Sequence, residues 1–433
     1  MFDWIFESSK DCEQTDSQMI QDAVNLASNK GVSSVVIPAV NPRSGKCLYE
    51  IDEAILLPSD ITVYLENCYM VLKDGICDNI FRNENMYSEV FGLENSEQRN
   101  ISIIGVGHPV LDGAGHNDVF EWSSLKDGYK HVSANNLIIF HNVDGFEIKN
   151  IEVRNQRWWA LNFIYCSNGH ICDITSRTDA LFSNQDGINL RYGCHHVTIE
   201  RISGNSGDDF IALSAIGGNK RYQQSVEGKE RDIHDIVVRD IIGTSAHEGI
   251  VTLRCHDGSN MYNILVENII ESNYDNENLL PYGTILIGQN YFYGNKVGDY
   301  GSMRNLTLRN IHTKSGGTCI TLGNTLIDSK IENLDVGGCV NAVTTTNYDH
   351  RGLVELSKRS YGKNGIKLSN VKIDGVHIRG DIIGTPIELA QMRDDDFIEN
   401  LVITNVVGYD TEKLLDYCRN GKSKIVVESK EYV

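Results

Sequence analysis

Two acidic turns, each followed by a short apolar strand, decide the fold of this chain. The first reads Ser183-Asn-Gln-Asp-Gly-Ile-Asn-Leu190, and the second reads Gly207-Asp-Asp-Phe-Ile-Ala-Leu213. They lie about one supersecondary repeat apart, so in a stack of coils at the strand spacing of about 4.8 Å, Asp186 falls beside Asp208 and Asp209. Like charges at close range drive carboxyl pKa values apart, which leaves one proton donor beside one base. The pattern predicts acid/base chemistry on stacked strands.

A short pattern recurs along the chain: apolar and polar residues alternate and end at a bend rich in Asn and Asp. It begins at Gly145, Asn168, His196, Asp235, Asn263, Asn305, Asn370 and Asn400. Apart from the 65 residues between Asn305 and Asn370, the intervals run from about 23 to about 42 residues, which fits a coil of three short strands with variable loops. Alternation sends every second side chain into a narrow core, and Asn or Asp tolerates left-handed geometry at the bends. We therefore expect an all-β fold, a right-handed parallel β-helix solenoid.

One continuous domain is predicted over residues 1–433. No linker, charge block or low-complexity run divides the chain, and 39 Gly against 6 Pro suit short strands joined by tight turns. The segment that starts at Thr15 combines a helix start signal with apolar residues at helical spacing. We expect this N-terminal helix, within a cap of about residues 12–34, to cover the open end of the solenoid. Coils are expected over about 35–410, with a C-terminal cap or tail over about 411–433.

Composition argues against several classes of partner. A formal charge of −20, spread along the chain, disfavours nucleic acid and anionic membrane surfaces. No apolar run reaches the roughly 18 residues of a membrane span, and the N-terminus lacks the segments of a secretory signal. Eleven cysteines without regular metal-ligand spacing fit reduced thiols. The sequence predicts a cytoplasmic protein with no cofactor or metal, and it leaves the oligomeric state open.

Several of these stretches resemble family 28 glycoside hydrolases of the polygalacturonase type. The resemblance rests on Thr15-Asp-Ser with Val35-Val-Ile-Pro, Arg157-Trp-Trp-Ala-Leu, Asn184-Gln-Asp-Gly, and Gly207-Asp-Asp followed by His247. It covers about residues 12–410 in architecture and is most specific over 183–213. In that family an Asn-x-Asp on one coil and an Asp-Asp on the next form an inverting site. The resemblance implies that Asp208 is the general acid and that Asp186 with Asp209 activates water.

Further side chains near these carboxylates are expected to bind substrate. They are Asn184, His247, Glu248, Arg254, His256 and Trp158. Strand alternation turns one of Trp158 and Trp159 inward, so at most one offers a platform for a sugar ring. The chain departs from the family at two places: Ala246-His-Glu-Gly stands where the family shows Gly-His-Gly, and Gly283-Thr-Ile-Leu-Ile-Gly replaces the Arg-x-Lys strand that binds a uronate carboxylate.

We expect a glycosidase that cleaves pectin-type or related oligosaccharides from an end, with inversion. Because the cationic pair is missing, a buried uronate lacks charge-assisted hydrogen bonds, so a neutral or deoxy sugar should be accepted at least as well as galacturonate. Three alternatives stay open. The chain could be a β-helix lyase or epimerase that uses His247 and Arg254, a non-catalytic sugar-binding solenoid, or a protein whose acidic cluster holds a cation such as Ca²⁺.

Overall fold

The protein divides into two compact units, each with its own core. The computed structural model describes residues 14–114, 136–180, 184–215, 225–246, 248–255, 258–272, 282–288, 299–314, 317–348, 360–363, 366–379, 382, 384–390, 396–408, 415–418 and 423–428. Unit 1 comprises Met1–Gly207 and Gly218–Arg231, and unit 2 comprises Asp208–Gly217 and Asp232–Val433. The single domain expected over 1–433 stays a prediction.

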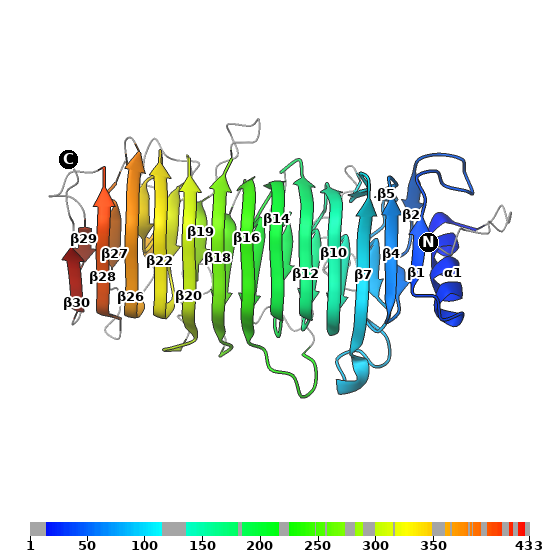
Figure 1. Ribbon diagram of the computed structural model, residues 1–433, viewed down its shortest axis with the longest axis horizontal. Helices are drawn as coiled ribbons and strands as arrows, with labels where there is room; N and C mark the ends of the chain where they lie inside the picture. The colour runs from blue at the N-terminus through cyan, green and yellow to red at the C-terminus, as the bar shows by residue number, and fades with distance from the viewer. Residues whose placement is uncertain are drawn as a thin grey trace. The chain divides into compact units, whose positions relative to one another are not determined.

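The described residues of unit 1 form one α-helix, a short 3-10 helix and two stacks of parallel strands (Figure 1). The first sheet runs β1-β4-β7-β10-β12-β14, with β2, β5 and β8 joined to it through β10, and the second runs β3-β6-β9-β11-β13. The bounds are α1 Asp16–Asn29, β1 Ser34–Ile37, β2 Tyr49–Ile51, β3 Ile55–Leu57, β4 Ile61–Glu66, β5 Tyr69–Leu72, β6 Phe81–Asn83, η1 Glu94–Ser96, β7 Gln98–Val106, β8 Val110–Asp112, β9 Ile138–His141, β10 Val143–Arg154, β11 Leu161–Ile164, β12 Ser167–Arg177, β13 Ile188–Leu190 and β14 His195–Ser206.

Helix α1 covers the first strands of unit 1, as the sequence predicts. It begins with a capping box in which Thr15 and Gln18 satisfy each other's backbone N–H groups. The Gln21 side-chain amide donates to the Leu56 carbonyl at 3.1 Å and accepts from the Leu56 N–H at 2.6 Å. These bonds occupy backbone groups of β3, the last strand of its sheet, and so protect an edge that would otherwise invite pairing. The N-terminal cap is confirmed.

Unit 2 repeats a long and a short parallel strand (Figure 1). The long strands form the sheet β16-β18-β20-β22-β26-β28-β30, the short ones form β15-β17-β19-β21-β23-β27-β29, and β24 pairs with β25 as an antiparallel hairpin. The bounds are β15 Ile211–Ala215, β16 Ile233–Ser245, β17 Gly249–Cys255, β18 Met261–Glu271, β19 Gly283–Ile287, β20 Met303–Thr313, β21 Thr318–Leu322, β22 Thr325–Gly337, β23 Asn341–Thr344, β24 Thr346–Tyr348, β25 Ser360–Lys363, β26 Lys367–Arg379, β27 Ile387–Ala390, β28 Phe397–Val407, β29 Leu415–Cys418 and β30 Ser423–Glu428.

Asparagines bend the long strands of unit 2. Asn263 and Asn268 on β18 have φ angles of 55° and 57°, in the left-handed region that Asn tolerates. The Asn268 amide donates to Asp240 at 2.8 Å and accepts from Asn310 at 2.9 Å, so successive coils are joined by a ladder of side-chain hydrogen bonds. The bends that the repeat predicts are therefore present. The predicted parallel β-helix is confirmed, with β29 and β30 continuing the sheets into residues 411–433.

Both cores consist of inward-facing apolar side chains at alternate strand positions. Strand β18 follows the pattern with Ile264, Val266 and Ile269 buried. The cysteines whose side chains the structure describes are all free thiols, and most of them are buried. In the described part of the chain, no helix is both long and apolar enough to span a membrane.

Candidate functional site

The candidate carboxylates occupy equivalent places at the entry to the short strands. Asp186 lies two residues before β13 in unit 1. In unit 2, Asp209 lies two residues before β15, and Glu248 immediately precedes β17. Each of these three strands is preceded by a turn or bend that carries the acidic residue. The acidic turns recognised in the sequence therefore have a common structural position.

The turn that carries Asp186 is fixed by hydrogen bonds within unit 1. The Asp186 side chain is 4% exposed, and its Oδ2 accepts from the Asn189 amide at 2.9 Å. The Asp186 carbonyl accepts from the Gln156 side-chain amide and from the Ala160 N–H, each at 2.9 Å. Asn184, which begins the turn, is half-buried and has a φ of 65°. The neighbouring coil thus fixes the Asp186 backbone, and Asn189 orients the carboxylate.

Trp158 and Trp159, of which at most one was expected to offer a sugar platform, are both buried in this structure. Their rings are only 3% and 8% exposed. They pack against each other with centroids 5.5 Å apart, and the guanidinium of Arg191 lies 4.6 Å from the Trp159 ring centroid. Alternation predicts that one of two adjacent residues faces outward, but here the turn before β11 interrupts the strand and both rings are packed. The expected role of Trp158 in binding substrate stays a prediction.

The Ser245 hydroxyl forms hydrogen bonds with the backbone of both Asp208 and Glu248. Ser245 Oγ donates to the Asp208 carbonyl at 2.7 Å and accepts from the Glu248 N–H at 3.1 Å. Asp208 is half-buried, and its Oδ1 accepts from the Asp209 N–H at 3.0 Å. Ser245 therefore links the Glu248 backbone to the Asp208 backbone. Residues His247 and His256, both predicted to bind substrate, lie outside the described residues.

Asp209 is held by a buried ion pair and a hydroxyl group. It is 2% exposed and forms an ion pair with the guanidinium of Arg254, whose second nitrogen also lies 3.3 Å from the carboxylate. The Thr252 hydroxyl donates to the same carboxylate. Arg254 is itself 5% exposed and lies 3.8 Å from Glu248 Oε2. The structure thus places Arg254 as a support for Asp209, and its expected role in binding substrate stays a prediction.

The strand expected to lack a cation is the direct neighbour of β17. In β19, Gly283 pairs with Gly249 and Ile287 pairs with Leu253. The Thr284 side chain of this strand is fully buried, and its Oγ1 has no hydrogen-bond partner among the residues that the structure describes. Lys229, a cation on the segment before β16, binds Glu97 at 2.8 Å within unit 1.

Sequence reasoning missed four supporting residues: Gln156, Asn189, Ser245 and Thr252. Thr252 could have been found, because it lies two residues before Arg254 and strand alternation places both side chains on one face. Gln156 and Ser245 act through backbone carbonyls in turns. No pattern of apolar and polar residues marks such contacts.

Comparisons with known proteins agree with this architecture. Residues 79–227, about a third of the chain, match the family model of Glycosyl hydrolases family 28, which confirms the resemblance seen in the sequence. A family 28 exopolygalacturonase from Yersinia enterocolitica is 15% identical, with a TM-score of 0.58 over 98% of this chain and 77% of that one. A polygalacturonase from Erwinia carotovora is 14% identical, with a TM-score of 0.51 over 97% and 94%.

A tailspike protein mutant of E. coli bacteriophage HK620, in complex with a hexasaccharide, shares the fold as well. It is 13% identical, with a TM-score of 0.59 over 97% of this chain and 73% of that one. Among curated proteins, no match is found. At these identities the solved structures establish the fold alone.

Proposed function

We propose that this protein is a glycoside hydrolase that cleaves pectin-type or related oligosaccharides from an end, with inversion at the anomeric carbon. The observation that carries the proposal is the carboxylate of Asp209, buried and fixed by Arg254 and Thr252, next to the more accessible Asp208. A rigidly held carboxylate can act as a base, and a neighbouring carboxyl group that solvent reaches can donate a proton. The match to the family 28 model supports the same reaction class.

In the proposed mechanism, Asp208 donates a proton to the glycosidic oxygen as the bond to the anomeric carbon breaks. Asp186 and Asp209 orient a water molecule and accept its proton as it attacks from the opposite face. Arg254, Thr252 and the Asn189 amide each act by positioning a carboxylate. This assignment follows the resemblance residue by residue. Each carboxylate is then expected to contribute about 10²-fold or more to the rate enhancement, which is typical of general acid/base groups.

A second function is favoured by the shared fold with the tailspike protein. A solenoid of this kind can bind an oligosaccharide along its coils without cleaving it, and the acids would then be dispensable. The two proposals differ in products: a hydrolase yields a saturated new reducing end, whereas a binding protein yields none. A lyase would yield an unsaturated product that absorbs in the ultraviolet.

The test is a panel of defined oligosaccharides, with product mass and ultraviolet absorbance as readouts. Asp208→Asn, Asp186→Asn and Asp209→Asn should each lower turnover by about 10² or more, because amides keep the side-chain volume and lose the acid or base. Asp240→Asn is the matched control, since Asp240 also occupies a bend, with a φ of 57°, but lies outside the site. Near-normal turnover in all three folded variants would favour the binding protein.

A further inference from the structure

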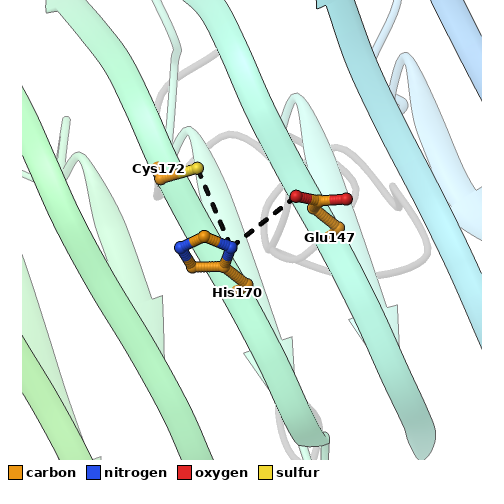
Figure 2. A group of neighbouring side chains, drawn as sticks. All are labelled: Glu147, His170 and Cys172. Carbon is orange, nitrogen blue, oxygen red and sulfur yellow. Dashed lines mark hydrogen bonds and ion pairs between the residues drawn. The ribbon is translucent and has the colours of Figure 1, made fainter.

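Three metal-ligating side chains converge on the long-strand sheet of unit 1, away from the candidate carboxylates. They are Glu147 on β10 with His170 and Cys172 on β12. Parallel pairing sets Glu147 opposite His170, and His170 and Cys172 lie on the same face because they are two residues apart. Figure 2 shows the imidazole between the Glu147 carboxylate and the Cys172 thiol. None of the three has a part in the proposed glycosidase mechanism.

The ligand atoms of the three residues lie close together, somewhat farther apart than the ligands of a bound zinc ion. His170 Nδ1 lies 3.6 Å from Glu147 Oε1 and 3.9 Å from Cys172 Sγ, and all three atoms lie within 4.8 Å of one another. In a tetrahedral zinc site, bonds of about 2.0 Å to N and O and about 2.3 Å to S place the ligand atoms roughly 3.3 to 3.5 Å apart. The distances from His170 Nδ1 to Glu147 and to Cys172 are therefore about 0.3 to 0.4 Å longer than in such a site.

A fourth residue orients the imidazole. His170 Nε2 lies 3.1 Å from Glu200 Oε1, and Glu200 is buried and also bound by Arg201. A neutral imidazole that donates from Nε2 to a carboxylate turns the lone pair of Nδ1 outward, here toward Glu147 and Cys172. Metal-binding histidines are commonly held in this way, with the second ring nitrogen on a carboxylate.

The surrounding charges favour a cation. Besides Glu147 and Glu200, Asp173 contributes a third carboxylate, while Lys149 and Arg201 are the neighbouring cations. Arg201 is engaged by Asp173 and Glu200. Lys149 pairs in register with Cys172. Three carboxylates against two cations leave a net negative charge around the ligand atoms.

We propose that Glu147, His170 and Cys172 bind a divalent transition metal ion of the zinc type, with Glu200 as the carboxylate that orients His170. A thiolate and an imidazole select such ions over Mg²⁺ and Ca²⁺, which prefer oxygen ligands. On binding, the Sγ–H bond of Cys172 breaks, a sulfur–metal bond forms and the proton passes to solvent. Three protein ligands leave a fourth position for water.

Cobalt provides the direct test, because Co²⁺ bound by a thiolate gives a charge-transfer band that oxygen and nitrogen ligands do not give. Titration of the full chain should saturate at one Co²⁺ per chain with this band, and Zn²⁺ should abolish it by displacement. Cys172→Ser should remove the band, and Glu147→Gln should weaken Co²⁺ binding at least about 10-fold. Glu200→Gln should weaken it by about 10- to 100-fold, as expected for a residue that orients a ligand.

Two matched controls separate this site from the other thiols and imidazoles of the chain. Cys47→Ser removes an exposed cysteine, and His108→Gln removes a histidine that binds Glu152 at 2.9 Å. Both variants should retain the spectrum and the affinity. A wild-type spectrum without a thiolate band would overturn the proposal, as would an unchanged spectrum in Cys172→Ser. If Cys172→Ser does not fold, the half-buried Glu147→Gln variant decides, and wild-type affinity in that variant overturns the proposal.

Discussion

Arg254 on β17 forms a buried ion pair with Asp209, the acid that precedes β15. Thr252 lies two residues before Arg254 on the same strand and donates its hydroxyl to the same carboxylate. Both side chains project from the same face of β17, so a single strand of unit 2 sets the position of Asp209. The residues that hold the proposed base are thus part of the core, so their effect on stability can be measured separately from their effect on catalysis.

Arg254→Ala should destabilise unit 2 strongly. Removing one member of a buried ion pair leaves the other charge uncompensated, which costs about 3 to 5 kcal/mol of unfolding free energy. Arg309→Ala is the matched control, because Arg309 binds Glu267 in a pair whose arginine is 44% exposed, and such pairs contribute about 0 to 1 kcal/mol. Urea unfolding midpoints measure both. Equal losses in the two variants would contradict the buried pairing of Arg254 with Asp209.

Thr252→Val should lower kcat and leave KM nearly unchanged. The substitution keeps the shape of the side chain and removes one hydrogen bond to a carboxylate, worth about 1.5 to 3 kcal/mol, which corresponds to roughly 10- to 100-fold in rate if the bond is needed in the transition state. Thr321→Val is the control, because the Thr321 hydroxyl pairs with Thr318 at 2.8 Å. A rise in KM at constant kcat would instead show that Thr252 contributes to substrate binding.

Much of the fold could be predicted because it follows from local rules. The alternation in Asn263-Ile-Leu-Val-Glu-Asn-Ile fixes which side chains of β18 face the core, and the two asparagines fix where the strand bends. The helix start at Thr15 was equally visible. Such features depend on neighbours within a few residues, so the sequence contains them directly.

The details of the candidate site depend on contacts between distant residues, and these were harder to predict. The partner of Arg254 proved to be Asp209, 45 residues away, and the sequence offered a substrate carboxylate as an equally reasonable partner. Trp158 and Trp159 are both buried, which strand alternation does not predict because the turn before β11 interrupts the strand. The group of Glu147, His170 and Cys172 was not recognised, because its members meet only through the register of β10 and β12.

Asn268→Ala should destabilise the coil bend more than Asn268→Gly. Alanine at a φ of 57° costs roughly 1 to 2 kcal/mol in backbone energy, whereas glycine adopts this conformation without that strain. Both variants lose the hydrogen bonds to Asp240 and Asn310, so the difference between them isolates the backbone term. Urea midpoints compared across the wild type and both variants provide the measurement. A larger loss in the glycine variant would refute this account of the bend.

Neutral or deoxy oligosaccharides should be turned over at least as well as matched galacturonate oligosaccharides. Strand β19 has no cation to pair with a uronate carboxylate, and Lys229 is engaged by Glu97. A buried carboxylate without a charged partner forgoes about 1.5 to 3 kcal/mol of hydrogen bonding. Steady-state kcat/KM on matched pairs decides the question. A strong preference for long polygalacturonate, cut internally, would show that the predicted specificity is wrong.

The stereochemistry of the first product tests the central claim most directly. An acid and a base that act on opposite faces of the sugar, with a water molecule between base and anomeric carbon, invert the configuration in a single displacement. Proton NMR of the nascent reducing end, recorded before mutarotation, should show the anomer opposite to that of the cleaved bond. The retained anomer would contradict the assignment of Asp208 as acid and of Asp186 with Asp209 as the groups that activate water.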